Sequence, residues 1–264
     1  MSRLEEYYHP NEIRLLIRNE EWKSSTVGLA KGYVQANVLI IPKEKAYEFM
    51  LFCIRNPKPC AVIEVLDEGN PVPEFSCSNS DIRFDISKYR IYKKGRLDCE
   101  TYNIADYWRN DFVTFILGCS FTFENALLNA GIRIKHIEES KKVPMYSTNI
   151  KCNKVGNIET NMVVSMRPIS WDNIAETIQI TSRYPTMHGA PVHIGSPRDI
   201  GIADIMKPDF GDPVEISNNE APVFWACGGT VYNFVNELKC DIAITHAPSH
   251  MYILDLKDES FAVI

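Results

Sequence analysis

Three stretches of this chain follow the order strand, helix, strand, and this order constrains the fold more than any other feature of the sequence. In the first stretch, β-branched and aliphatic residues predict a strand over residues 34–41, which stops at a proline. Residues 43–55 carry apolar side chains at every third or fourth position, which predicts a helix. A second strand is predicted over residues 60–66. Because a helix joins the two strands, we expect them to be parallel and their crossover to be right-handed.

Two further units of this kind follow in the second half of the chain. Their elements are predicted over residues 161–167, 171–183 and 190–194, and over residues 222–227, 231–238 and 241–245. Residues 106–130 are predicted to be helical in two pieces that meet at Gly118. The alternation predicts an α/β protein with a mixed or parallel sheet flanked by helices. It also predicts a main α/β domain of residues 1–145 and 200–264, with a smaller α+β domain of residues 146–199 inserted in it.

The composition excludes several classes of partner. The chain of 264 residues has 28 lysines and arginines against 34 aspartates and glutamates, which leaves a net charge of −6. A chain without a basic excess is a poor candidate for binding nucleic acid or an anionic membrane. Its longest apolar stretch, residues 112–119, is far shorter than the roughly 20 residues that a membrane helix needs. A small anionic substrate needs only a few local cations and stays compatible, and a homo-oligomer is left open.

The cysteines and the N-terminus bear on metal binding and location. None of the 8 cysteines forms a CxxC pair, and the histidine spacing matches no helical zinc motif. We therefore expect no metal and no cofactor. The first residues mix acidic and basic side chains and lack the apolar segment of a signal peptide. Together these features predict a cytoplasmic protein with reduced cysteines.

Two turns that contain glycine and cysteine are candidate substrate-binding sites. Cys119 and Ser120 precede a predicted helix whose free N–H groups would bind an anion and would activate the thiol. An ordinary helix cap beside a buried cysteine explains the same residues, with Glu124 favourably placed in the first turn. Cys227 and Gly228 follow a predicted strand, where backbone N–H groups at the sheet edge would face a ligand. A tight turn that requires glycine is the alternative there.

Four of the 6 histidines lie in two short loops that contain proline, namely His188, His193, His246 and His250. Loops on a rigid scaffold often carry function, and an imidazole titrates near neutral pH. Because prolines break any helical spacing between these histidines, proton transfer or a hydrogen bond to substrate is favoured over metal binding. We rank His188 and His246 as catalytic and His193 as substrate-binding. Packing of the loops is the alternative for each ring.

Charged residues near the ends of predicted elements supply a carboxylate clamp and further proton-transfer groups. Arg167 ends a predicted strand and Arg183 ends a predicted helix. Either guanidinium could hold a substrate carboxylate through two parallel hydrogen bonds. Asp209 lies in a loop rich in proline and glycine, and with Glu124 it is a candidate catalytic acid or base. Turn formation by its side chain is the alternative for Asp209.

These features occur together in a known family. Ten blocks carry the resemblance, in order along the chain: Gly28–Asn37, Arg55–Cys60, Leu117–Glu124, Val143–Tyr146, Val164–Ile169, Ile180–Arg183, His188–Gly195, Lys207–Asp212, Pro222–Gly228 and Ile244–Pro248. On these blocks the chain resembles the D-glutamate cyclase family, whose bacterial members are commonly described as putative hydro-lyases, and the resemblance extends over about residues 14–257. Lys31, where the family has proline, and residues 229–232 depart from the family pattern.

The resemblance implies an α/β protein with a second, smaller α+β domain. It also implies that the chain converts D-glutamate to 5-oxo-D-proline with loss of water. A hydro-lyase acting on another small carboxylate and a non-catalytic carboxylate-binding protein are the alternatives. Ring closure needs a neutral amine aimed at the γ-carboxyl carbon, donors for the oxyanion and an acid for the departing oxygen. It requires no covalent nucleophile, so Cys119 and Cys227 need not react. The implied partner is a small carboxylate or amino acid.

Overall fold

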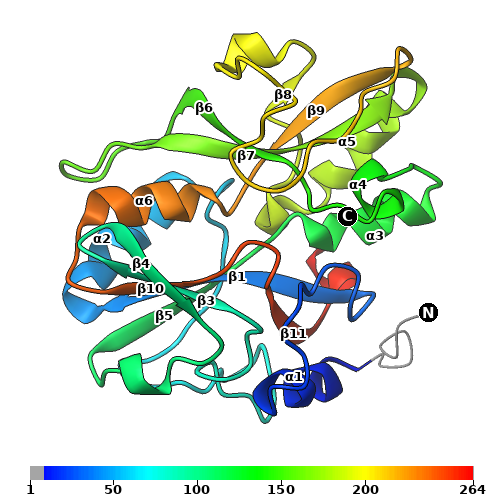
Figure 1. Ribbon diagram of the computed structural model, residues 1–264. Coiled ribbons are helices and arrows are strands. Elements are labelled where there is room, and N and C mark those ends of the chain that lie inside the picture. Colours follow the sequence, from blue (N-terminus) through cyan, green and yellow to red (C-terminus); the bar gives the residue numbers. More distant parts are fainter. Residues whose placement is uncertain (1–8, 264) are drawn as a thin grey trace.

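The computed structural model describes residues 9–263 (Figure 1). Its helices are α1 (Pro10–Arg18), α2 (Lys43–Arg55), α3 (Phe121–Asn129), α4 (Lys135–Glu138), α5 (Ile174–Ser182) and α6 (Thr230–Leu238). Its strands are β1 (Tyr33–Pro42), β2 (Val62–Val65), β3 (Tyr89–Lys93), β4 (Arg96–Thr101), β5 (Phe112–Leu117), β6 (Met145–Lys151), β7 (Asn161–Ser170), β8 (His193–Ile194), β9 (Glu220–Ala226), β10 (Ala243–His246) and β11 (Tyr252–Lys257). Among these described residues, no helix is long and apolar enough to cross a membrane.

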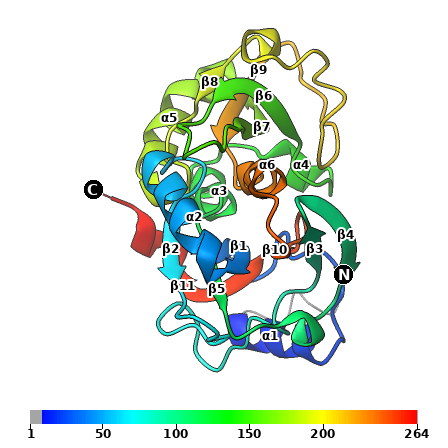
Figure 2. The same cartoon turned by 90° about the vertical axis from the view of Figure 1, so that its left-hand side faces the viewer.

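Two antiparallel sheets form the framework. The larger has seven strands in the order β2-β5-β1-β10-β3-β4, with β11 also paired to β1. The smaller has four strands in the order β6-β7-β9-β8. Every strand pair in both sheets is antiparallel. In Figures 1 and 2 the smaller sheet lies above the larger one, with helices between and beside them.

The expected α/β class with a mixed or parallel sheet is therefore wrong, and the protein is α+β. The first unit has its elements where the sequence predicts them, as β1, α2 and β2. However, β5 lies between β1 and β2 and pairs antiparallel with both. The two strands thus run in the same direction without being neighbours. The apolar residues 112–117, which the sequence analysis expects to be helical, form this inserted strand. A short apolar run suits either element, so periodicity alone does not separate them.

The second unit repeats this insertion, and the third joins the two sheets. β7, α5 and β8 follow the predicted order, but β9 lies between β7 and β8. In the third unit β9 belongs to the smaller sheet and β10 to the larger, with α6 connecting them. The two sheets therefore place equivalent strands in the same spatial order: β2-β5-β1-β10 in the larger sheet corresponds to β8-β9-β7-β6 in the smaller one. The domain division at residues 146–199 stays a prediction.

Apolar side chains from both sheets meet between the layers and fix the strand ends. Side chains on one face of β1 pack against α2 and α6, where the rings of Phe52 and Phe234 lie 4.6 Å apart. Side chains on the other face of β1 join α3 and the smaller sheet, including Phe123 and Trp225 with ring centroids 5.5 Å apart. This packing holds the β5–α3 turn and the β9–α6 turn toward each other.

Candidate functional site

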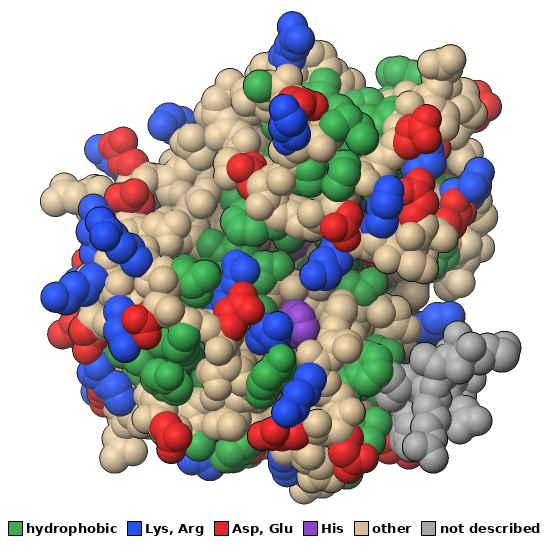
Figure 3. Space-filling view, in the orientation of Figure 1, with side chains coloured by type: hydrophobic (Ala, Val, Ile, Leu, Met, Phe, Trp, Pro, Cys, Tyr) green, Lys and Arg blue, Asp and Glu red, His purple; other side chains and the backbone are tan. Residues whose placement is uncertain are grey.

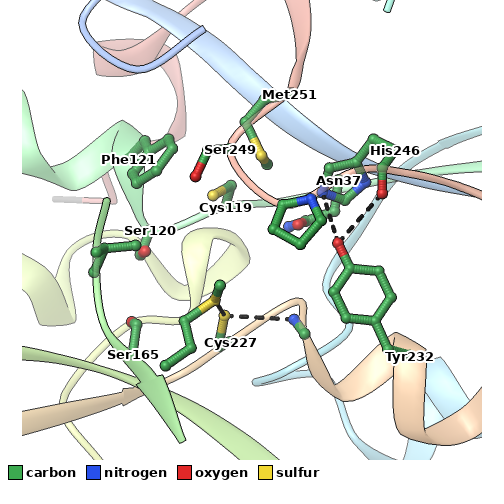
Figure 4. Close-up of a pocket in the computed structure, with 14 residues that line it drawn as sticks. Asn37, Cys119, Ser120, Phe121, Ser165, Cys227, Tyr232, His246, Ser249 and Met251 are labelled. Atoms are coloured by element: carbon green, nitrogen blue, oxygen red, sulfur yellow. Dashed lines mark hydrogen bonds between the residues drawn. The ribbon is translucent and has the colours of Figure 1, made fainter. Parts of the chain in front are cut away.

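A small cavity of about 30 Å³, partly open to solvent, lies between the two sheets. Asn37 and His246 line it from the larger sheet, and Ser165 and Cys227 line it from the smaller sheet or its end. Figure 4 shows Ser120, Phe121 and Ser165 along one side, facing Asn37 and His246. The space-filling view is hollowed where the two sheets meet (Figure 3). A cavity between the layers matches the usual placement of ligand sites.

Two glycines bring the turns close enough to form this cavity. A Cβ at Gly118 would overlap the carbonyl oxygen of Thr186, and a Cβ at Gly228 would overlap the side chain of Asn37. The Asn37 amide nitrogen donates to the carbonyl of Gly118 at 2.6 Å, which ties β1 to the β5–α3 turn. Both glycines are therefore required by close packing rather than by an unusual dihedral angle.

The two cysteines occupy equivalent places in these turns. The Gly229 N–H donates to the Cys227 sulfur at 3.4 Å, and the Phe121 N–H partly offsets the rise in the Cys119 pKa. Burial raises the pKa of Cys119 to about 12 and also raises the pKa of Cys227. Both groups are therefore neutral thiols near neutral pH, which disfavours a nucleophilic role.

Arg167 lies behind the cavity wall and is fully buried. It donates to the hydroxyl oxygens of Ser165 at 3.0 Å and Ser120 at 2.9 Å. Its Nε also donates to Glu124 at 2.7 Å, and a second short bond from Nη2 reaches the same oxygen. Its guanidinium lies 5.4 Å from the ring centroid of Trp225. Most of its donors are thus occupied by the protein.

This arrangement orients the two serine hydroxyls. Each oxygen accepts a hydrogen bond from Arg167, so each hydroxyl proton points elsewhere. Among the described residues, no group accepts a bond from Ser120 or Ser165 hydroxyl, and both side chains line the cavity. A donor next to a cation is also a stronger donor. The pair therefore presents two polarised O–H groups to a ligand in the cavity.

Glu124 balances the charge of Arg167. Burial alone would raise the pKa of Glu124, but Arg167 and His136 outweigh it, and the pKa lies below its usual range. His136 Nε2 lies 3.4 Å from Oε1 of Glu124, the oxygen that also accepts from Arg167. The carboxylate is therefore ionised near neutral pH, as a buried carboxylate beside a guanidinium should be.

His246 lines the cavity in a defined tautomer. Its Nδ1 accepts a hydrogen bond from the Val38 N–H at 3.1 Å, so in the neutral ring the proton sits on Nε2. Nε2 lies 3.4 Å from the hydroxyl of Tyr232. Burial lowers the pKa of His246 to about 4, which keeps the ring neutral near pH 7. In this state the ring offers an N–H donor, and its proton-transfer role stays a prediction.

The remaining predicted site residues lie away from the lining of this cavity. His188 is fully buried and its Nδ1 pairs with the Lys58 carbonyl at 2.7 Å. His193 is partly exposed and pairs with its own loop. Arg183 donates to the Val263 carbonyl near the C-terminus. Asp209 is exposed and accepts from a backbone N–H of β6. Their catalytic and binding roles stay predictions.

Asn37, Ser165 and Tyr232 are among the lining residues that were not candidates from sequence reasoning. Asn37 and Ser165 each interrupt an apolar strand with a polar side chain that is almost fully buried. A buried polar group inside a strand needs a partner or a ligand, and this is the signal that could have found them. Tyr232 carries no such signal, because an aromatic residue on an apolar helix face usually belongs to the core.

Metal ligation has no support in the described part of the chain. No group of three or more His, Cys, Asp or Glu side chains there is arranged to hold a metal ion. The cysteines at the cavity are neutral and the histidine ring faces a tyrosine.

A model of the D-glutamate cyclase family matches residues 113–255, a stretch that carries both turns and the cavity serines. The chain belongs to the D-glutamate cyclase family. It is 54% identical over 253 residues to "Putative hydro-lyase GK2103" of Geobacillus kaustophilus, with 96% of each chain covered. It is 49% identical over 255 residues to "Putative hydro-lyase YcsI" of Bacillus subtilis, with 97% of this chain and 99% of the relative covered. The family predicted from the ten sequence blocks is confirmed.

Proposed function

We propose that this member of the D-glutamate cyclase family is a hydro-lyase that closes D-glutamate to 5-oxo-D-proline with loss of water. The observation that carries the proposal is the pair of serine hydroxyls, Ser120 and Ser165, whose oxygens accept from Arg167 and whose side chains line the cavity. Such a pair recognises an anionic oxygen. The names of the relatives supply the reaction class, and the family supplies the substrate.

The surroundings of the cavity favour an anion as well. Helices α3 and α6 both begin at its wall, and the N-terminal end of a helix carries partial positive charge. Burial and the positive charges of Lys88 and Lys142 lower the pKa of His250 to about 4. These cations thus act electrostatically on His250, which stands between the lining residues Ser249 and Met251. Positive charge near a binding site raises the local concentration of an anionic substrate.

The proposed reaction balances without a cofactor or a covalent intermediate. The amine nitrogen attacks the γ-carboxyl carbon, a C–N bond forms, and one C–O bond breaks. Two protons of the substrate ammonium leave with the departing oxygen as water. The developing oxyanion accepts hydrogen bonds from Ser120 and Ser165, which are already oriented by Arg167. Holding amine and carboxyl together supplies much of the remaining acceleration.

Product analysis on matched substrates tests the proposal. The purified chain is incubated with D-glutamate, L-glutamate, 5-oxo-D-proline and several dicarboxylates, and products are identified by mass. We expect 5-oxo-D-proline from D-glutamate, and a fall of about 10²–10³ in kcat for Ser165→Ala, as for the loss of an oxyanion donor. Ser182→Ala is the matched control, because that hydroxyl bonds only the carbonyl of Ile178 on an exposed helix face.

Other outcomes select among the alternatives. Loss of water from a different carboxylate, with the same dependence on Ser165, makes the chain a hydro-lyase of another substrate. Stabilisation by a carboxylate without any product makes it a binding protein. Turnover that does not change in Ser165→Ala contradicts the assignment of the cavity as the active site.

A further inference from the structure

A second cavity runs along α3, directly beside the first. It has a volume of about 110 Å³, is partly open to solvent, and lies between α3 and the loop that leads into β1. The α3 residues that line it are Phe121, Glu124, Asn125 and Leu128, which share one helix face. Phe121 also lines the first cavity. In Figure 1 this loop, in dark blue, lies below α3.

A buried residue that lines this cavity, Gln35, has an unused hydrogen-bond acceptor. The Gln35 side chain is 5% exposed, and its Nε2 donates to the carbonyls of Thr26 and Leu29, both at 3.0 Å. Those two bonds fix the orientation of the amide. The opposite atom, Oε1, is buried and accepts no hydrogen bond from any described residue. A buried amide oxygen without a donor is costly, so a ligand that supplies the donor would be favoured.

Glu124 supplies a second acceptor in the same cavity. Its bonds with Arg167 all reach Oε1, and the contact with His136 involves that oxygen too. Among the described residues, none donates to Oε2. The carboxylate is ionised, because Arg167 and His136 outweigh burial and lower its pKa. Two acceptors, one of them anionic, suit a group that carries N–H donors and positive charge.

We propose that this second cavity is the subsite for the substrate ammonium group, with Gln35 Oε1 and Glu124 Oε2 as its acceptors. The proposal rests on the proposed function and assigns the substrate to the amino acids rather than to simple dicarboxylates. The first cavity then holds the side-chain carboxylate at Ser120 and Ser165. The exposed Lys31, which also lines the second cavity, is placed to pair with the carboxylate on the same carbon as the amine.

The geometry of α3 links the two subsites. Ser120 lies at the start of the helix in the first cavity, and Glu124 lies one turn later in the second. One turn of helix advances about 5.4 Å, so a D-glutamate folded back for attack of its amine on the γ-carboxyl carbon can contact both residues. Arg167 bonds both Ser120 and Glu124, so it holds the two subsites in register. Phe121, at the junction, must turn aside for one ligand to occupy both.

Matched ligands test the subsite. D-glutamate and glutarate differ in the amine and the charge it carries, so their dissociation constants are compared by calorimetry. Wild type should prefer D-glutamate by about ten-fold or more, as the loss of a charged hydrogen bond predicts. Gln35→Met removes Oε1 and should abolish most of that preference while leaving glutarate affinity within about two-fold. Leu128→Met, in the same lining but without a polar atom, is the control.

The other outcomes distinguish a ligand-binding role of Gln35 from a purely structural one. If Gln35→Met weakens both ligands equally, Gln35 only braces its loop and the proposal is overturned. Gln35→Glu keeps an oxygen acceptor, so it should retain the preference for D-glutamate over glutarate. Loss of that preference in Gln35→Glu also counts against the subsite. Equal affinity of wild type for the two ligands overturns the proposal without any variant. A preference that depends on Gln35, found without formation of 5-oxo-D-proline, refutes the proposed function but supports the subsite.

Discussion

The buried pair of Arg167 and Glu124 should show strong energetic coupling. The perturbation is a double-mutant cycle of Arg167→Met, Glu124→Leu and both together. Arg167 is 0% exposed and Glu124 is 5% exposed, so either single change leaves a charge in the interior without its partner. Such a change typically costs about 3–5 kcal/mol. Arg167→Met also removes the donors to two serines, which adds to that cost.

The double variant should be far less destabilised than the sum of the single variants. Replacing a buried pair with apolar side chains of similar volume is often close to neutral, because the desolvation of both charges disappears together. We therefore expect a coupling energy of at least about 3 kcal/mol. Carboxylate binding in the first cavity should be lost in the double variant all the same, because neither serine is oriented.

Urea unfolding at pH 7 measures the cycle, with each variant followed by fluorescence and by circular dichroism. The control cycle uses Arg133 and Glu138, which form two hydrogen bonds, at 2.8 and 2.7 Å, but lie at the surface. That pair should show little or no coupling, because an exposed ion pair contributes little to stability. Effects of Arg167 and Glu124 that add within about 0.5 kcal/mol would refute the description of the site as one buried network.

Three further predictions concern acid, packing and charge. Burial lowers the pKa of His188 and of His246 to about 4, so between about pH 6.5 and 4 the unfolded state binds protons that the folded state does not. The free energy of unfolding should therefore fall as the pH drops through this range. Urea titrations should show a shallower fall for His188→Gln. Gly118→Ala should cost at least about 2 kcal/mol in stability because its Cβ meets fixed backbone, whereas Gly229→Ala, which meets only a side chain at 3.0 Å, should cost less in the same denaturation assay. Lys142→Gln should raise the KM for a carboxylate substrate and weaken its salt dependence, as kinetics at low and high ionic strength would show.

The sequence predicts individual helices and strands better than it predicts which strands pair with each other. Helix α2 begins and ends at the predicted residues 43 and 55, because apolar periodicity and the flanking prolines define it. The directions of β1 and β2 also agree with a crossover. Their neighbours could not be predicted, because β5 comes from a segment about fifty residues later and inserts between them. Such long-range pairing depends on the whole sheet and leaves no mark in a local pattern.

Some of the residues predicted for the site line the cavity, and others have partners elsewhere in the protein. Cys119, Ser120, Cys227 and His246 do lie together at one cavity. Arg167 lies behind it and acts on the serines, since a fully buried guanidinium must satisfy its donors within the protein. His188 and His193 share a loop motif but face separate partners. Residue type indicates what a side chain could do, and only burial and partners decide what it is free to do.

The repeated strand order explains why two weak sequence signals form one site. Each turn, taken alone, is an ordinary start of a helix with a cysteine beside it. Because β5 and β9 occupy equivalent places in the two sheets, the turns that follow them meet face to face. Each turn then contributes a helix N-terminus and a buried thiol, and the smaller sheet adds Ser165. An anion between the sheets would therefore contact both halves at once, so a change in either turn should weaken its binding even where the fold of the other turn is intact.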